Sequence, residues 1–330
     1  MNKRKFGHMR TVAVTAVGAV AIVALAGCGN SSGSASGAAS EGGGKKLKVG
    51  SLVYDTTVPY FTPMIAGEKK AAEEMGVDLD IQNGQGDLSK QIAVVQQFIA
   101  QKKDVLVIAA SDSKGIAPAV KLANQAGIPV IANQTVIDGA ESVTYVGSDN
   151  VTYGRYLGKG VCQLTGGKGN IAVIMGILGS SPQFDRKQGL TEELAKSCPD
   201  VKILAEATAN WDNTKALAVG QDFLNRFPQG KLDLIVDQGP EGVAPAQWAK
   251  KNGRTEVKWI VGDVPKAVAA SIEAGNVDMA VHQDPADQGY KSVINAVNWA
   301  RGDKDKVKTP RDYSENRLIT KENLNTVAPY

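Results

Sequence analysis

Histidine is nearly absent from this chain of 330 residues, which contains only His8 and His282. Zinc sites rich in histidine and the two-histidine iron sites of oxygenases need at least two such ligands close together in the fold. His8 lies in the basic opening segment, so a single histidine remains for the rest of the chain. The sequence therefore argues against most metalloenzyme chemistry, and we expect no metal site.

A surplus of positive charge is also lacking once the opening segment is set aside. The formal net charge is +3, but Lys3, Arg4, Lys5 and Arg10 all lie within residues 1–27, which contain no acid. The remainder holds 33 bases and 34 acids. Proteins that bind nucleic acids usually carry a basic patch or stripe, so the composition argues against a nucleic-acid partner.

The motifs of common α/β enzymes are missing as well. No Gly-x-Ser-x-Gly elbow and no complete Gly-x-Gly-x-x-Gly loop follows any predicted strand. The segment Gly166-Gly167-Lys168-Gly169-Asn170 does not fit the spacing of a phosphate-binding loop. We therefore expect a protein that is not an enzyme, with no catalytic residues and no cofactor.

Residues 1–27 have the layout of a secretory signal peptide, with a basic start followed by the uncharged apolar run Thr11–Ala26. That run is short for a membrane span. Leu25-Ala26-Gly27-Cys28 resembles the bacterial lipobox, whose cysteine becomes an acylated N-terminus. Residues 28–45 are rich in Gly, Ser and Ala, which is typical of a flexible linker. We predict lipidation at Cys28 and attachment to the outer face of a bacterial cell membrane, since two or more acyl chains anchor stably.

From Lys46 onward, short apolar runs alternate with amphipathic stretches. The predicted strands are Leu47–Val53, Val77–Ile81, Val105–Ala110, Pro129–Ala132, Ile171–Met175, Val201–Ala205, Leu232–Val236, Lys258–Val261 and Val277–Val281. The predicted helices are Pro63–Met75, Leu88–Ala100, Ile116–Ala126, Phe184–Lys196, Thr214–Phe227, Val243–Lys251 and Val264–Ala274. Apolar strands separated by single helices indicate parallel sheet covered on both faces. We predict an α/β fold of two doubly wound parallel-sheet lobes joined by a multi-strand hinge.

The first series ends and the second begins at Tyr145–Asn150, which makes that segment the candidate hinge. The charged tail after Trp299 contains no helix-plus-strand unit, so it must complete lobes begun elsewhere. We expect an N-terminal lobe of residues 46–148 plus 284–312, and a C-terminal lobe of residues 149–283 plus 313–330.

Two cysteines remain after Cys28, namely Cys162 and Cys198. Each is predicted near the C-terminal end of a helix, and these helices flank the strand at 170–175. Such helices run parallel, so their ends lie at the same edge of the sheet. An exported protein tolerates a disulfide, and we expect one here; two unrelated buried thiols are the alternative.

Polar and aromatic residues follow the predicted strands: Tyr54-Asp55, Ser111-Asp112, Asn133-Gln134, Trp211-Asp212, Asp237-Gln238, Gly262-Asp263 and His282-Gln283. In doubly wound sheets, ligands lie beyond the carboxyl ends of the strands. Two facing lobes would therefore enclose a small molecule. Amides and carboxylates beside aromatic rings suit a neutral compound with many hydroxyl groups.

Several segments, taken in order, resemble the type I periplasmic binding proteins that supply ribose and related sugars to ABC importers. They are Val58-Pro59-Tyr60-Phe61, Ala126–Ile131, Ser148-Asp149-Asn150, Arg186 with Gly189-Leu190, and Ala280–Pro285 followed by Gln288-Gly289. The resemblance covers about residues 46–320. It implies a monomer that closes over a small sugar or polyol and presents it, unaltered, to an ABC permease with its ATPase.

The resemblance also implies roles for individual residues. Tyr60 and Phe61 would stack on the ligand from one lobe, and Trp211 from the other. Arg186 would donate charge-assisted hydrogen bonds to ligand oxygens. The remaining ligand contacts implied are Asn133, Gln134, Gln238, Asp263 and Gln283.

One departure from the family concerns Gln134-Thr135, where ribose and galactose binders carry Asp-Arg. The ion-assisted pair is absent, which favours another sugar, a sugar alcohol or a less typical polyol. The run from Val58 to Thr62 also resembles binders of the autoinducer-2 furanosyl signal. That ligand, and a sensory sugar receptor in place of a transport protein, stay open as alternatives.

Overall fold

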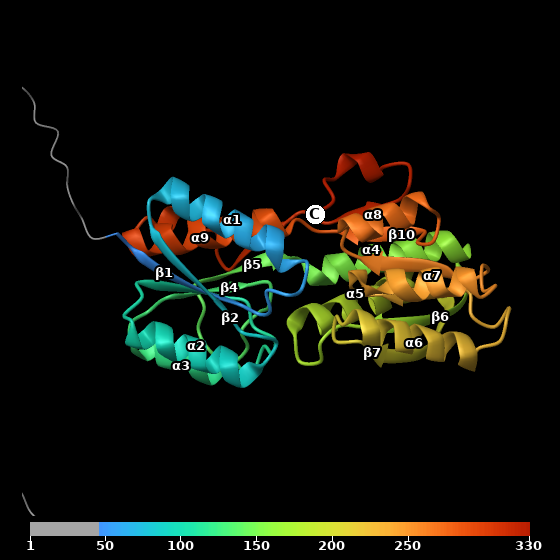
Figure 1. The fold of residues 1–330 in the computed structure, drawn as a ribbon, viewed down its shortest axis with the longest axis horizontal. Helices are drawn as coiled ribbons and strands as arrows, with labels where there is room; N and C mark the ends of the chain where they lie inside the picture. Colours follow the sequence, from blue (N-terminus) through green and yellow to red (C-terminus); the bar gives the residue numbers. More distant parts are fainter. Residues whose placement is uncertain (1–45) are drawn as a thin grey trace, which may run out of the picture. The chain divides into compact units, whose positions relative to one another are not determined.

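The computed structural model describes residues 46–330, which form two α/β lobes, each built around a six-stranded sheet (Figure 1). The predicted signal peptide, Cys28 and the linker lie outside the described residues. Within residues 46–330, no helix combines the length and apolar character needed to cross a membrane.

The N-terminal lobe has the strand order β11-β5-β4-β3-β1-β2, and all its neighbouring strands are parallel. Its strands are β1 (Lys48–Val53), β2 (Asp78–Asn83), β3 (Val105–Ile108), β4 (Val130–Asn133), β5 (Thr144–Ser148) and β11 (Arg311–Ser314). Helices α1 (Phe61–Met75) and α9 (Pro285–Arg301) cover one face, and α2 (Leu88–Ala100) and α3 (Ala117–Gln125) cover the other (Figure 1). Apolar strands buried on both faces explain why this sheet is parallel.

The C-terminal lobe repeats this plan with the order β12-β10-β9-β8-β6-β7, and only β12 runs antiparallel to its neighbour. Its strands are β6 (Lys168–Met175), β7 (Asp200–Thr208), β8 (Leu234–Asp237), β9 (Lys258–Gly262), β10 (Met279–His282) and β12 (Arg317–Ile319). One face carries α4 (Asn150–Thr165) and α5 (Ser181–Ser197); the other carries α6 (Asn213–Arg226), α7 (Val243–Lys251) and α8 (Lys266–Glu273). Three short 3-10 helices are η1 (Pro240–Gly242), η2 (Lys304–Lys306) and η3 (Leu324–Thr326).

The predicted fold class is confirmed: every predicted strand and helix is present, with ends that differ by a few residues. The elements that were not predicted are mainly those after the second crossing. Helix α9 begins at a capping residue, since Asp284 accepts a hydrogen bond from the backbone N–H of Asp287 (3.0 Å). Strand β11 is polar and strand β12 has only three residues, so both lack the apolar run that identifies the other strands.

The chain passes between the lobes three times: after β5, after β10 and after β11. The third passage lies later in the chain than the predicted lobe boundary after residue 312. Strand β11 pairs with β5 from Arg311 to Ser314, so Tyr313 and Ser314 lie in the N-terminal sheet and not in the C-terminal lobe. The physical reason is that the polar strand β11 takes its register from β5, which the local sequence does not indicate.

Cys162 and Cys198 are joined by a disulfide, with 5.7 Å between their Cα atoms. Cys162 lies in the last turn of α4 and Cys198 is the C-cap residue of α5, so the bond ties the ends of two packed helices. Cross-links of this kind stabilise a fold mainly by restricting its unfolded state.

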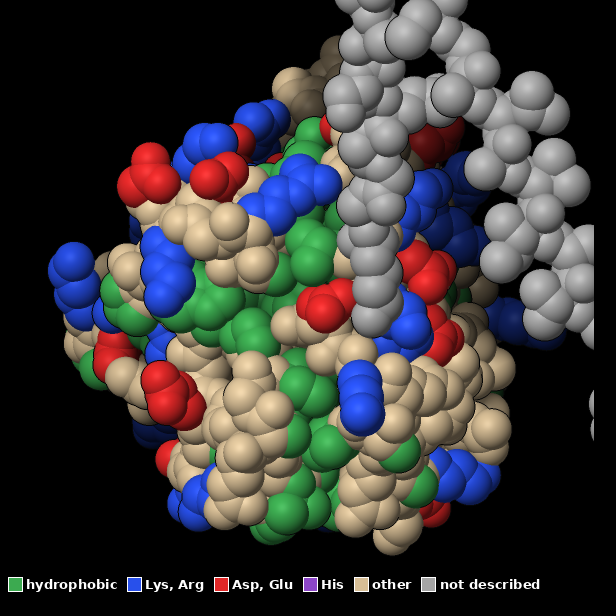
Figure 2. Space-filling model, turned by 90° about the vertical axis from the view of Figure 1, so that its left-hand side faces the viewer, with side chains coloured by type: hydrophobic (Ala, Val, Ile, Leu, Met, Phe, Trp, Pro, Cys, Tyr) green, Lys and Arg blue, Asp and Glu red, His purple; other side chains and the backbone are tan. Residues whose placement is uncertain are grey.

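Charged side chains of both signs are interspersed on the face of the N-terminal lobe seen in Figure 2. That distribution matches the near balance of acids and bases in the sequence after residue 27. Favourable long-range attraction to a nucleic acid requires a concentration of one sign, and this face does not provide it.

Candidate functional site

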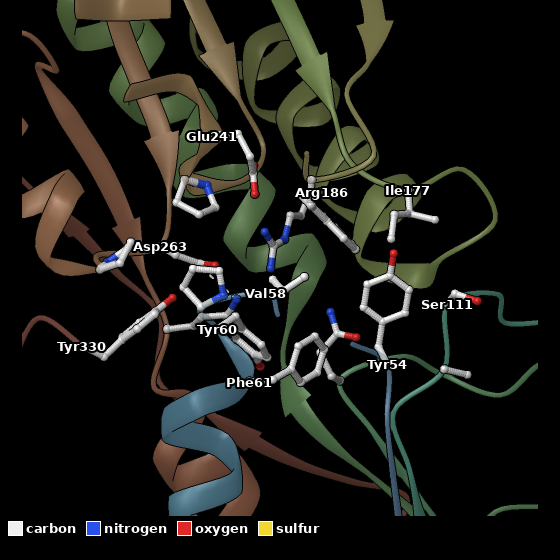
Figure 3. A pocket seen from close by; sticks show the side chains of 17 residues that line it. Tyr54, Val58, Tyr60, Phe61, Ser111, Ile177, Arg186, Glu241, Asp263 and Tyr330 are labelled. Carbon is white, nitrogen blue, oxygen red and sulfur yellow. Dashed lines mark hydrogen bonds between the residues drawn. The ribbon is translucent and has the colours of Figure 1, made fainter. Parts of the chain in front are cut away.

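A cavity lies between the two lobes, beyond the carboxyl ends of their strands, and encloses roughly 580 Å³ of empty space including its mouth (Figure 3). Its walls are Tyr54, Val58, Pro59, Tyr60, Phe61, Ala110, Ser111 and Gln134 from the N-terminal lobe, and Ile177, Arg186, Trp211, Pro240, Glu241, Asp263, Pro265, Gln283 and Tyr330 from the remainder. Interfaces between domains are a common place for small-molecule sites.

Three of these residues share an unusual backbone conformation. Gln134, Trp211 and Asp263 come directly or shortly after β4, β7 and β9, and their φ angles are +64°, +54° and +58°. Residues other than glycine rarely adopt this left-handed region, and such strain concentrates at functional sites. Hydrogen bonds stabilise this backbone conformation at two of the three residues. The N–H of Gln134 donates to the Val146 carbonyl, and the N–H of Asp263 donates to the Val281 carbonyl, both at 2.8 Å.

An aromatic wall is formed by the N-terminal lobe. Tyr60 and Phe61, at the start of α1, meet edge to face with 5.1 Å between ring centres, and Tyr54 lies 5.9 Å from Phe61. The hydroxyl of Tyr60 donates to the side-chain carbonyl of Gln288. Burial raises the pKa of Tyr60 well above its ordinary value, so the phenol stays neutral. The wall thus combines apolar ring surface with one anchored hydroxyl.

Trp211 supplies ring surface from the C-terminal lobe. Two glycines make room for its indole: a Cβ at Gly176 would lie 2.4 Å from the ring, and one at Gly239 would lie 2.6 Å from it. The ring is half-buried and lines the cavity. An aromatic face therefore comes from each lobe. A ligand between the lobes can contact an aromatic ring on each of its two sides.

Arg186 is the one guanidinium in the cavity wall and is only 2% exposed. Its Nε donates to Oδ1 of Asn150 (2.9 Å) and one terminal nitrogen donates to the carbonyl of Gln238 (2.5 Å). Its guanidinium carbon lies 3.8 Å from the ring centre of Tyr153, a distance suited to cation–π attraction. These contacts hold the guanidinium rigidly, with its position in the cavity already set before a ligand binds.

Acids surround the cationic group. Oδ1 of Asp263 accepts hydrogen bonds from the Tyr153 hydroxyl (3.1 Å) and from Nε2 of Gln283 (2.8 Å). Glu241 lines the cavity, and Asp237 lies behind the wall. Burial raises the pKa of Asp237 to about 8, and burial together with Asp237 raises the pKa of Glu241 well above its ordinary value. At neutral pH the cavity therefore presents neutral acids as well as charges.

Polar side chains from all three crossings form one hydrogen-bond network at the hinge. Ser148 donates to Oε1 of Gln283 (2.6 Å) and lies 2.9 Å from Oδ1 of Asn316. Nε2 of Gln288 donates to Oε1 of Gln283 (3.0 Å) and to the hydroxyl of Ser314 (2.7 Å). Gln283 therefore connects the hinge to Asp263 and, through Gln288, to Tyr60. Rotation of the lobes and the positions of cavity residues are coupled through these contacts.

Direct hydrogen bonds also join the two lobes outside the cavity wall. The N–H of Ser113 donates to the Gly179 carbonyl (3.0 Å), and the N–H of Ser181 donates back to the Ser113 hydroxyl (3.1 Å). The N–H of Val136 donates to the Ser181 hydroxyl (2.8 Å). We call these four residues the latch. With the latch formed, the two lobes are in a closed arrangement.

Seven of the nine side chains predicted to contact the ligand line the cavity: Tyr60, Phe61, Gln134, Arg186, Trp211, Asp263 and Gln283. Asn133 and Gln238 do not line it, and ligand contact stays a prediction for all nine. Asn133 is still part of β4, and its amide faces Sδ of Met64 (3.5 Å). The amide of Gln238 is occupied by the Gly176 N–H (3.1 Å) and the Gln183 carbonyl (3.0 Å).

Four polar cavity residues were not predicted as ligand contacts: Tyr54, Ser111, Glu241 and Tyr330. Tyr54 directly follows β1, and its position at a strand end was a usable signal. Glu241 lies in η1, four residues beyond the last residue of β8, so no strand-end pattern marks it. Tyr330 follows all the recognisable motifs, and only the fold brings it to the cavity.

Comparison with known proteins gives consistent matches. The model of the periplasmic binding protein domain matches residues 49–304. The chain is 28% identical to the ribose import binding protein of Escherichia coli over 265 residues, 80% of this chain and 87% of the relative. It is 30% identical to the xylitol-binding protein of Mycolicibacterium smegmatis over 248 residues, which are 74% of this chain and 69% of the relative. The crystal structure of a Caulobacter myo-inositol binding protein bound to myo-inositol superposes with a TM-score of 0.80 at 28% identity, covering 86% of this chain and 97% of that one.

Proposed function

The chain belongs to the periplasmic binding protein domain family, and from this premise we propose that it captures a small neutral sugar or sugar alcohol between its lobes for an ABC importer. It is a solute-binding protein and not an enzyme. The relatives named above bind ribose, xylitol and myo-inositol, which share many hydroxyl groups on a small carbon frame. The observation that carries the proposal is the closed cavity with an aromatic face from each lobe and polar groups between them.

Each group of the cavity has a role in this proposal. Phe61 and Tyr60 contact one carbon face of the polyol, and Trp211 contacts the other. Arg186 donates to ligand oxygens, while Asp263 and Gln283 bind hydroxyl groups. Charge-assisted hydrogen bonds contribute about 1.5–3 kcal/mol each, so two or three of them account for much of the roughly 8 kcal/mol of a micromolar complex.

Closure of the lobes follows from differential affinity. A polyol that touches both walls binds the closed arrangement more tightly than an open one, so it shifts the population toward closure. The closed form then docks on the permease, whose partner ATPase supplies the energy. Because the latch contacts form only when the lobes meet, they add stability to the liganded form.

A ligand screen by thermal shift tests this function. The panel is D-ribose, xylitol and myo-inositol, and at least one of them should raise the melting temperature of wild type and be recovered chemically unchanged. Trp211→Ala should reduce this stabilisation, whereas Trp299→Ala, which alters a residue outside the cavity, should keep it. Chemical conversion of a bound polyol, or equal stabilisation of the Trp211 variant, would contradict the proposal.

Gln134 favours a ligand other than ribose. Thr135 donates to Oε1 of Gln134 (2.8 Å), which orients a neutral amide at this point of the wall. A carboxylate can accept from two neighbouring hydroxyls with charge assistance, and an amide oxygen that already accepts from Thr135 is a weaker acceptor. We expect xylitol or myo-inositol to stabilise the protein more than D-ribose does, as read in the same screen.

The N-terminal sequence supports attachment to the membrane. We propose that Cys28 is acylated and that residues 28–45 tether a monomeric binding protein to the outer face of the cell membrane. Cys28→Ser should move the protein from the membrane fraction to the medium or periplasm without loss of polyol binding. Retention of the variant in the membrane fraction would contradict anchoring through this residue.

A further inference from the structure

Two buried oxygen atoms in the wall of the cavity have no hydrogen-bond partner within residues 46–330. They are Oε2 of Glu241 and the hydroxyl oxygen of Tyr330. Buried polar atoms in folded proteins are nearly always paired, and an unpaired one calls for a physical explanation. Neither residue has a role in the binding arrangement described so far.

The backbone around Tyr330 is held firmly, and its ring points into the cavity. Its carbonyl accepts a hydrogen bond from the backbone N–H of Lys266 (2.9 Å). Leu324, six residues earlier, is 8% exposed and packs in the core of the C-terminal lobe. Figure 3 shows the phenol of Tyr330 beside Asp263 and Tyr60, with its hydroxyl turned inward. Burial, followed by the charge of Asp263, raises the pKa of Tyr330 well above its ordinary value, so the hydroxyl keeps its proton.

Glu241 approaches from another part of the same lobe. It is 4% exposed, and Figure 3 shows its carboxyl pointing into the cavity on the side of Arg186. The carboxyl occupies space that Gly239 leaves open, since a Cβ at that glycine would lie 2.2 Å from Oε2. Burial and the neighbouring Asp237 favour its neutral form. A neutral carboxyl group can both donate and accept a hydrogen bond.

We propose that Glu241 and Tyr330 are specificity-determining ligand contacts, each of which meets one hydroxyl group of the bound polyol. The inference rests on the proposed function and extends it to two residues outside the family motifs. A ligand group that reaches either oxygen removes the cost of an unpaired buried atom. A ligand without that group leaves the oxygen unpaired in the closed cavity and binds less tightly, so this wall selects among polyols.

Variants without the polar atom test the two contacts by isothermal titration with the panel member that stabilises wild type most. Tyr330→Phe and Glu241→Leu should each weaken its binding about tenfold. The matched controls are Tyr313→Phe and Glu315→Leu, which alter exposed residues outside the cavity, and they should bind like wild type. Unchanged affinity in both cavity variants would overturn the proposal. Tighter binding to Tyr330→Phe would also overturn it, because Tyr330 would then act as an obstruction.

One further measurement separates a ligand contact from an internal structural role. The melting temperature of the ligand-free variants does not depend on any ligand. It should stay level or rise, since each change removes an unpaired polar atom, and a fall of several degrees would show an internal structural role. If no panel member binds, the proposed function fails, whereas a fall in the melting temperature of the ligand-free variants would overturn the present inference alone.

Discussion

The two lobes share one architecture but supply different chemistry to the cavity. Each is a six-stranded sheet covered on both faces by helices. The N-terminal lobe contributes Tyr54, Tyr60, Phe61 and a neutral amide, whereas the C-terminal lobe contributes Arg186 together with acidic groups. Aromatic contact thus comes from both rigid bodies, since Trp211 belongs to the C-terminal lobe, whereas every charged side chain of the cavity wall comes from the C-terminal lobe. A ligand is bound fully only when both bodies meet, which couples recognition to closure.

The lobes also share a device that carries cavity residues to the cleft. In each, two helices cross so closely that glycine is required: a Cβ at Gly67 or Gly289 would lie 2.0 Å from a backbone oxygen of the partner helix, and likewise at Gly189. In the N-terminal lobe the closely packed pair is α1 and α9, and in the C-terminal lobe it is α4 and α5. One places the rings at the start of α1, and the other places Arg186. The Arg-x-x-Gly spacing therefore reflects helix packing as well as ligand contact.

The largest effect is expected from removing the cation of the C-terminal lobe. Arg186→Ala should weaken polyol binding more than a hundredfold, because it removes charge-assisted hydrogen bonds worth about 1.5–3 kcal/mol each. Isothermal titration measures the loss. Arg155→Ala alters an exposed arginine on α4 that pairs with Glu192, and it should bind like wild type. Near-normal affinity of the Arg186 variant would mean that the lobes do not divide the chemistry as described.

Alanine at the helix crossings should destabilise both lobes to a similar degree. Gly189→Ala and Gly289→Ala each force a methyl group against backbone, and overpacking of this kind costs about 1–3 kcal/mol. Denaturant unfolding measures this loss. Thr191→Ala, at an exposed site on α5, serves as the control. Only Gly189→Ala should also disturb Arg186 directly, because both residues lie on α5. Equal polyol affinity of the two glycine variants would contradict the proposed link between the packing of α4 on α5 and the position of Arg186.

Each lobe buries one carboxyl group whose pKa is raised to about 8, Glu68 in the N-terminal lobe and Asp237 in the C-terminal lobe. The main cause in both is burial; a hydrogen bond from Ser51 partly offsets it at Glu68. The unfolded chain binds these protons only below its ordinary carboxyl pKa. The stabilisation is therefore complete below the ordinary carboxyl pKa and is lost as pH rises through about 8. Within that interval, each group raises the equilibrium constant for unfolding by up to tenfold per pH unit.

Amide variants separate the two lobes in this respect. Glu68→Gln and Asp237→Asn should each flatten the fall in melting temperature between pH 5 and pH 9, while Glu73→Gln, at an exposed position on α1, should leave it unchanged. A wild-type protein that becomes more stable as pH rises over this interval would contradict the assignment of raised pKa values to these groups.

The smallest effect is expected at the latch. Ser113→Ala removes the hydroxyl that accepts from the Ser181 N–H, and a single neutral hydrogen bond contributes about 0.5–1.5 kcal/mol. The variant should bind the preferred polyol about threefold to tenfold more weakly, mainly through faster release, as stopped-flow measurements would show. An unchanged release rate would indicate that the hinge network alone holds the lobes closed.

Local sequence was a good guide wherever the determining interactions are local. Strands such as Val105–Ile108 are buried along their whole length, so a run of apolar residues identifies them. Strands β11 and β12 carry no such run, and their pairing is decided by β5 and β10. The same distinction holds at the cavity. Asn133 and Gln134 are equally polar neighbours, but the positive φ of Gln134 is what separates a wall residue from a buried one.

By itself the sequence determined the alternation of strands and helices, the division into two series and the gathering of polar residues at strand ends. These features depend on periodicity and on the geometry of parallel sheets, which act over a few residues. The tertiary structure alone decided that the Gln238 amide is taken up by backbone groups, that Gln288 joins all three crossings, and that Tyr330 reaches the cavity. Each depends on contacts between segments far apart in the chain, and such contacts exist only after the lobes have packed.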